Sequence, residues 1–237
     1  DGDGVLDVAI GRLPVRSPEQ LRTLVTKILN YERTAGHDVW RRQVNIVAGL
    51  GGFGPVADAV LEVVTRTLLT QGIPAGFHTH LTYASWRSPY CPPPARFRES
   101  TIEAFNAGCL FWVYLGHGQR TLLDHVYVPG GSFPILGQSD VDALRPRVGS
   151  PIALLVACYS GAFDGAEACL AEAMLTSPTG PVAVIAGSRV TLPYGNAVFC
   201  TELMRECFAH RRGTIGEVLL HAKRACAENV DDRERTV

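Results

Sequence analysis

A cysteine and a histidine in the sequence are placed where they could carry out nucleophilic chemistry together. Cys158 ends the apolar run "PIALLVACYSG" (151–161), and His117 ends the apolar run "CLFWVYLGHG" (109–118). A buried structural thiol would be expected inside such a run, whereas a thiol at its end can reach solvent. Cysteine catalysis needs a thiolate, an imidazole that moves protons, and N–H donors for the developing oxyanion. The pattern predicts that Cys158 and His117 form a catalytic pair.

Either residue alone has an ordinary structural use. A lone Cys158 would be read as a buried, inert thiol, and a lone His117 as a turn histidine. Their common context favours the catalytic interpretation. Gly118 can offer a backbone N–H without a side chain to block close approach, and Gly161 lets the chain turn tightly away from Cys158.

Strand-like and helix-like segments alternate along the chain and must bring these residues together. Continuous apolar strands separated by helices favour an α/β fold with a mainly parallel sheet of about six strands. We expect strands at 6–14, 44–50, 77–83, 109–118, 151–158 and 181–188, and helices at 17–34, 55–72, 98–107 and 165–175, with a short helix from Ser139 and two closing helices.

Ligands of such sheets bind at the carboxyl ends of the strands. Three strands end in "YLGHGQ", "VACYSG" and "IAGSRV", so these three exits are predicted to meet at one edge. Gly187 and Ser188, at the third exit, are predicted to contact a substrate.

The motifs "YLGHG" (114–118) and "VACYSGAFD" (156–164) resemble the His and Cys motifs of the gingipain-type cysteine peptidases, peptidase family C25 of the caspase-like clan. Segments 7–32 and 170–188 also resemble that family, so the resemblance covers most of the chain. It implies a caspase-like three-layer αβα sandwich forming a single catalytic domain over 1–237, with 1–90 and 91–237 as two sub-lobes.

The resemblance also implies roles for individual residues. Cys158 would be the nucleophile that forms a thioacyl intermediate, and His117 the general acid/base. The N–H groups of Gly118 and Cys158 would form the oxyanion hole, and the substrate backbone would lie as an added strand near the sheet edge. Asp58 takes the place of an Asp that contributes to an arginine-selecting pocket; alternatively it complements the dipole of its helix in the first turn.

One missing acidic residue and one present acidic residue leave alternatives open. The family can have an acidic residue that orients the histidine, but segment 44–57 contains no Asp or Glu. A weak or inactive peptide-binding domain of a larger surface protein is therefore an alternative, as is a cysteine transpeptidase. Asp164 follows Cys158 and is expected to cap the helix that starts near Gly165, or else to tether the Cys158 loop.

The composition excludes several classes of partner. The 22 basic and 23 acidic residues nearly cancel, so neither a nucleic acid nor a membrane surface is expected. No apolar stretch reaches the roughly 18–20 residues of a membrane span. Seven cysteines without a CxxC pair fit neither a dense disulfide framework nor a zinc ribbon. The expected partner is a peptide or protein substrate.

No cofactor is expected to be required, although a structural calcium ion is considered. Asp1, Asp3 and Asp7 in "DGDGVLD" resemble a calcium-binding loop, but no Glu completes it, and a solvated acidic turn is the alternative. The chain begins without Met, which predicts a piece of a longer protein with flanking domains. The resemblance implies an extracytoplasmic or secreted location.

Overall fold

The computed structural model describes residues 6–34, 36, 38–49 and 72–229 of the chain. The chain divides into two compact units. The larger unit consists of 13–50 and 76–189, and the smaller one of 1–12, 51–75 and 190–237. The single domain over 1–237, with sub-lobes 1–90 and 91–237, stays a prediction. The three strand exits lie in the larger unit, except for Val190 at the end of the third.

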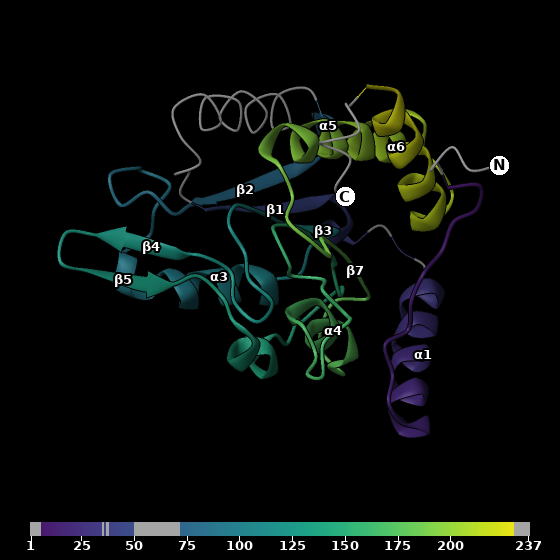
Figure 1. Ribbon diagram of the computed structural model, residues 1–237, viewed down its shortest axis with the longest axis horizontal. Coiled ribbons are helices and arrows are strands. Elements are labelled where there is room, and N and C mark those ends of the chain that lie inside the picture. The colour runs from purple at the N-terminus through teal and green to yellow at the C-terminus, as the bar shows by residue number, and fades with distance from the viewer. Residues whose placement is uncertain (1–5, 35, 37, 50–71, 230–237) are drawn as a thin grey trace. The chain divides into compact units, whose positions relative to one another are not determined.

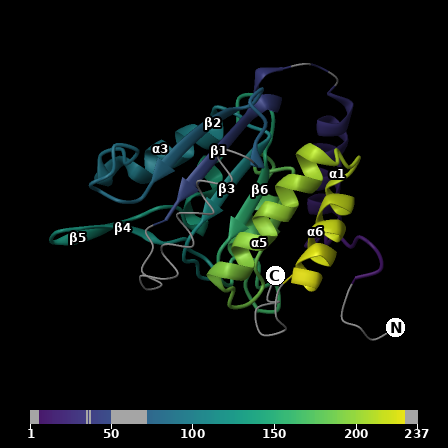
Figure 2. The ribbon, with the colours of Figure 1, turned by 90° about the horizontal axis from the view of Figure 1, so that it is seen from above.

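A five-stranded parallel sheet forms the centre of the larger unit, in the order β2-β1-β3-β6-β7. Figure 2 shows β2, β1, β3 and β6 side by side. The strands are β1 Gln43–Ala48, β2 His78–Tyr83, β3 Phe111–Leu115, β6 Ile152–Val156 and β7 Ala183–Ala186. Four of these strands lie within segments predicted as strands, and β1 begins one residue before its predicted segment 44–50. The mainly parallel α/β fold is confirmed.

The expected strand at 6–14 is wrong. In the part of the chain that the structure describes, the parallel sheet has five strands where about six were expected. No residue of 6–14 belongs to a β-strand. Their alternating apolar side chains face solvent instead, with Val8 62% and Ile10 67% exposed. The alternation has the period of a strand, but a strand forms only where a neighbour pairs with its backbone. Pro14 also lacks the N–H that a ladder needs.

Most helices of the larger unit begin and end close to the predicted residues. Helix α1 (Pro18–Arg33) begins after Ser17, whose hydroxyl oxygen accepts the N–H of Gln20 at 3.2 Å. Helix α3 (Phe97–Asn106) and the 3₁₀-helix Gln138–Ala143 also match expectation. Helix α4 (Leu170–Thr176) begins five residues later than expected, and the Glu172 carboxylate accepts the N–H of Cys169 at 3.0 Å there. The expected helix 55–72 lies, except for Gly72, outside the described residues.

The main apolar core lies on one face of the sheet. Alternate residues of the central strands, such as Trp112, Tyr114 and Leu155, pack with Phe97 and Phe105 of α3. The antiparallel hairpin of β4 (His125–Val128) and β5 (Gly131–Pro134), teal in Figure 1, occupies the excursion between β3 and the 3₁₀-helix. The core thus anchors the strands whose exits carry the predicted site.

The smaller unit contains α5 (Pro193–Met204), a π-helical turn (Arg205–Ala209) and α6 (Ile215–Asn229). Helices α5 and α6 lie side by side (Figure 1). Burial alone would raise the pKa of Glu206, but hydrogen bonds from Arg212 and His210 outweigh it and hold that pKa below its usual value. Among the described helices, none is both long and apolar enough to cross a membrane.

Candidate active site

The turn that carries His117 is held from below by a buried tyrosine. The Tyr114 hydroxyl donates a hydrogen bond to the His117 carbonyl oxygen at 2.7 Å and accepts the N–H of Asp124 at 3.3 Å. Burial raises the pKa of Tyr114, so the hydroxyl keeps its proton. A Cβ added at Gly116 would lie 2.7 Å from this hydroxyl, so only glycine fits there. The backbone of His117 is therefore fixed while its side chain stays half-buried.

The turn that carries Cys158 is a sharp one. Tyr159 adopts a φ of 55°, in the left-handed region that non-glycine residues rarely occupy. The N–H of Tyr159 donates to the carbonyl of Arg189 at 3.1 Å, and the hydroxyl of buried Ser160 donates to the carbonyl of Ala157 at 3.1 Å. Cys158 itself is half-buried. Strain of this kind recurs at functional sites, where surrounding contacts hold it in place.

The two turns meet because β3 and β6 are neighbours that end in register. Leu115 pairs with Val156, and the N–H of Gly116 donates to the Val156 carbonyl at 3.3 Å. A Cβ added at Gly118 would lie 2.6 Å from the Cβ of Ala157 and 3.0 Å from the carbonyl oxygen of Cys158. The segment after His117 therefore packs directly on the Cys158 turn, and a side chain at position 118 would separate them.

The third exit, after β7, lies against the same turn. The N–H of Gly161 donates to the carbonyl of Gly187 at 2.9 Å, and a Cβ at Gly161 would lie 3.0 Å from the carbonyl oxygen of Ala186. Gly187 is buried and Ser188 half-buried. The structure thus brings Gly187 and Ser188 to the Cys158 turn.

The partners of Asp164 at these exits are two arginines that the sequence did not point to. Arg189 Nη2 lies 2.9 Å from Asp164 Oδ2, and Arg120 Nη1 lies 3.8 Å from Asp164 Oδ1. Asp164 therefore does not cap α4, because that helix begins only at Leu170, and the carboxylate faces two guanidinium groups instead. The three residues are far apart in sequence, and no spacing pattern could have joined them.

A carboxylate also lies near the histidine turn, downstream of it rather than in segment 44–57. Asp124 follows Leu123, which pairs with Gly118 in an isolated antiparallel bridge. Its Oδ1 accepts the N–H of His125 at 2.8 Å and the hydroxyl of Tyr127 at 3.2 Å. Asp124 thereby orders the chain that crosses the His117 turn.

Several other cysteines lie in settings that suppress thiolate formation. Burial raises the pKa of Cys109, Cys200 and Cys207 to about 12. Cys169 is buried, and burial raises its pKa as well. These thiols stay protonated at neutral pH, and the buried ones, Cys109, Cys169 and Cys200, act as small apolar core residues.

Other predicted site residues lie partly beyond the described part of the chain. Asp58, Asp1 and Asp3 lie outside the described residues. Asp7 is exposed, and its carbonyl oxygen accepts a hydrogen bond from Arg224 Nη2 at 3.1 Å. Within residues 6–34, 36, 38–49 and 72–229, no group of three metal-ligating side chains occurs. The calcium site and the expectation that no cofactor is required remain predictions.

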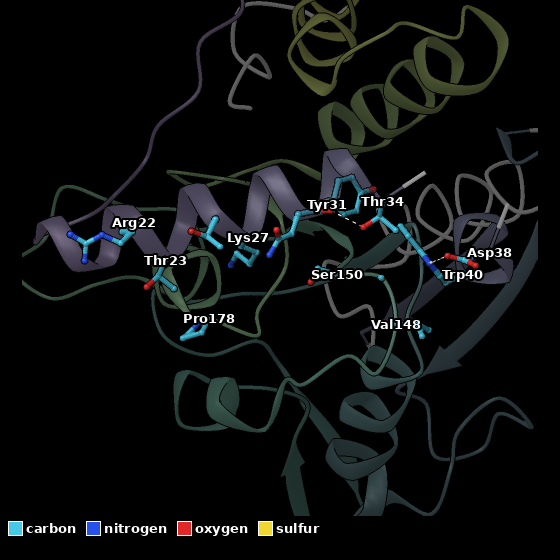
Figure 3. A pocket seen from close by; sticks show the side chains of 13 residues that line it. Arg22, Thr23, Lys27, Tyr31, Thr34, Asp38, Trp40, Val148, Ser150 and Pro178 are labelled. Atoms are coloured by element: carbon cyan, nitrogen blue, oxygen red, sulfur yellow. Dashed lines mark hydrogen bonds between the residues drawn. The ribbon is translucent and has the colours of Figure 1, made fainter. Parts of the chain in front are cut away.

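A groove of about 670 Å³ in the larger unit lies at the other end of the strands. Figure 3 shows Arg22 and Lys27 of α1 on one wall, with Ser150 and Pro178 opposite. Ser150 precedes β6, and Cys158 follows it, so the strand separates the groove from the Cys158 turn. Lys27 donates to the carbonyls of Leu175 and Ser177, and burial lowers its pKa to about 8. None of the described candidate catalytic or substrate-contacting residues lines this groove.

Comparisons with known proteins agree with the fold. The model of peptidase family C25 matches residues 1–237. Gingipain R2 of Porphyromonas gingivalis is 31% identical over 193 residues, which is 77% of this chain, and Gingipain R1 of the same species is also 31% identical. The crystal structure of the Arg-specific cysteine proteinase gingipain R superimposes with a TM-score of 0.79 and 26% identity, covering the whole chain.

The chain spans only part of these relatives. It covers 24% of Gingipain R2, 18% of Gingipain R1 and 54% of the crystallised gingipain R chain. A complex of gingipain pro- and mature domains matches equally well, with a TM-score of 0.79 and 55% of that chain covered. The relatives thus contain much sequence that has no counterpart in these 237 residues.

Proposed function

Because the chain belongs to peptidase family C25, we propose that it is a cysteine endopeptidase whose nucleophile is Cys158 and whose general acid/base is His117. The observation that carries the proposal is the contact between the two turns, in which Gly118 packs on Ala157 and on the carbonyl of Cys158. An imidazole and a thiol delivered to one edge by two adjacent strands are the parts that this chemistry needs.

The proposed reaction has two steps. The Cys158 thiolate attacks the carbonyl carbon of the scissile bond, and the C–N bond breaks as His117 gives its proton to the leaving amine. Water then attacks the thioacyl carbon, His117 takes a proton from the water, and the Cys158 thiolate leaves. Each step passes through an oxyanion, for which the N–H groups of Gly118 and Cys158 are the proposed donors.

Selectivity for Arg before the cleaved bond is a further part of the proposal. The similarity to gingipain R, described as an Arg-specific proteinase, supports it. Asp58 is the proposed partner, because a carboxylate can bind a guanidinium through two hydrogen bonds. Gly187 and Ser188 are proposed to contact the substrate backbone, and their position beside the Cys158 turn supports this role.

The test compares peptides that differ only in the residue before the cleaved bond. We expect the chain to cleave after Arg faster than after Lys or Leu, and Cys158→Ala to abolish cleavage. Asp58→Ala should reduce the preference for Arg while sparing other bonds. Binding without cleavage by the folded chain would favour a peptide-binding domain, and transfer of the acyl group to an added amine would indicate a transpeptidase.

The setting of the domain is proposed from its relatives. Because the chain spans less than a quarter of the gingipains that it matches, we place it within a longer protein that has flanking domains. An extracytoplasmic or secreted location follows from the same kinship. Fractionation of cells that express the complete gene would test it, and recovery only from the cytoplasm would contradict it.

A further inference from the structure

The Cys158 loop contains a carboxylate that is shared between two arginines. Asp164 accepts a bidentate interaction from Arg189, with Nη2 at 2.9 Å from Oδ2 and Nη1 at 3.5 Å from Oδ1. Arg120 approaches the same Oδ1 at 3.8 Å from another segment. We call Asp164, Arg120 and Arg189 the exit clamp, because they lie after the ends of β6, β3 and β7 respectively.

Arg120 is tied to the Cys158 loop by more than charge. Its Nη2 donates to the Glu167 carbonyl at 2.6 Å, and its own carbonyl accepts the N–H of Leu170 at 2.7 Å. A Cβ added at Gly165 would lie 2.2 Å from the guanidinium carbon, so the guanidinium rests on the bare glycine backbone. Arg120 therefore connects the segment after His117 to the far end of the Cys158 loop.

Arg189 connects the clamp to the strained residue beside Cys158. Its carbonyl accepts the N–H of Tyr159, and its Nη1 donates to the carbonyl of Ser188 at 2.8 Å. Holding the Arg189 side chain on Asp164 thus restrains the backbone whose carbonyl fixes Tyr159. A φ of 55° at Tyr159 persists only when such contacts hold it.

We propose that Asp164 is a positioning residue, which through Arg189 and Arg120 holds the Cys158 turn in place against the His117 segment. The expected effect on kcat rests on the proposed peptidase function. The expected effect on the order of the Cys158 loop does not. Asp164 and Arg189 are exposed, with 55% and 57% of their side chains accessible, while Arg120 is half-buried. Exposed ion pairs are individually weak and are screened by salt, so a moderate and salt-dependent effect is expected.

The structural arm measures amide hydrogen exchange in peptides from 157–169 of the complete chain. Asp164→Asn keeps the shape of the side chain but removes its charge, and should speed exchange at Tyr159 and Gly161. Glu167→Gln is the matched control, because Arg120 contacts only the backbone carbonyl of Glu167 among the contacts described. Asp164→Glu retains a carboxylate and should restore most of the protection.

The kinetic arm measures kcat and KM of the same variants. Asp164→Asn should lower kcat by roughly three- to tenfold with little change in KM, and high salt should reduce the difference between variant and parent. Arg189→Gln should reproduce the loss, and serves if Asp164→Asn folds poorly. Unchanged exchange and unchanged kcat would overturn the clamp. If the parent chain has no activity, the peptidase proposal fails, and hydrogen exchange alone decides on the clamp.

Discussion

The His117 turn and the Cys158 turn are neighbours, but different kinds of contact hold them. The His117 turn rests on the buried hydroxyl of Tyr114, which binds its carbonyl oxygen inside the core. The Cys158 turn is held by backbone hydrogen bonds to the β7 exit and by the exposed pairing of Asp164 with Arg189. One half of the candidate site is thus fixed from within the fold, and the other half from its surface.

Because of this difference, the two turns should respond differently to substitutions and to salt. A buried neutral hydrogen bond is shielded from salt, and losing it costs stability. An exposed ion pair contributes little to stability and responds to ionic strength. Substitutions of Tyr114, which supports the His117 turn, should therefore lower the unfolding free energy. Substitutions of Asp164 should mainly change the reactivity of Cys158.

The largest effect is expected from removing the imidazole. In His117→Ala the Tyr114 hydroxyl still binds the carbonyl of residue 117, so the turn should persist while proton transfer is lost. Turnover should fall by roughly 10²–10⁴-fold, the usual contribution of general acid–base catalysis. Peptide cleavage and thermal melting measured together would check this, and retained turnover would remove His117 from the mechanism.

A substitution at Gly161 should displace the Cys158 turn. In Gly161→Ala the new Cβ would lie 2.9 Å from the Cβ of Ala186 and 3.0 Å from its carbonyl oxygen, so the turn must move. We expect a loss of about 1–3 kcal/mol in unfolding free energy and a large fall in activity. Gly131→Ala is the matched control, because no heavy atom beyond its two chain neighbours lies within 4 Å of the added Cβ. Equal urea midpoints for the two variants would contradict the close approach.

The sequence predicted the parts of the site that depend on strand order and failed for those that depend on side chains. The approach of the His117 and Cys158 turns could be predicted because each residue ends an apolar run, and parallel strands end at one edge. The link between Arg120, Asp164 and Arg189 has no sequence signal, because it joins three separate exits. The alternation of apolar residues at 6–14 led to a wrong prediction of a strand. Such periodicity describes the side chains of a strand and not whether a partner strand is present.

A smaller effect tests the His117 side. Tyr114→Phe keeps the ring in the core but removes the donor to the His117 carbonyl and the acceptor of the Asp124 N–H. Unfolding free energy should fall by about 1–3 kcal/mol, because buried polar groups lose their partner. Urea unfolding at low and high salt should give the same difference. A salt-dependent loss would contradict the contrast between the two turns.

The smallest effect is expected far from both turns, in the groove beside α1. Burial lowers the pKa of Lys27 from 10.5 to about 8, so between these pH values the unfolded chain binds more protons than the folded one. The contribution of Lys27 to stability should therefore rise with pH from about 8 to 10.5. Urea unfolding of Lys27→Met against the parent across this range would detect it. Reactivity of Cys158 should not change.

The most direct test of the account is the site of covalent modification by a peptide that carries an electrophile after Arg. Mass spectrometry of the folded chain at neutral pH should find one adduct, on Cys158, while Cys109 and Cys200 stay unmodified because burial raises their pKa to about 12. Cys158→Ala should then take up no label. An adduct on another cysteine, or none on the folded chain, would contradict the claim that the His117 and Cys158 turns form one catalytic site.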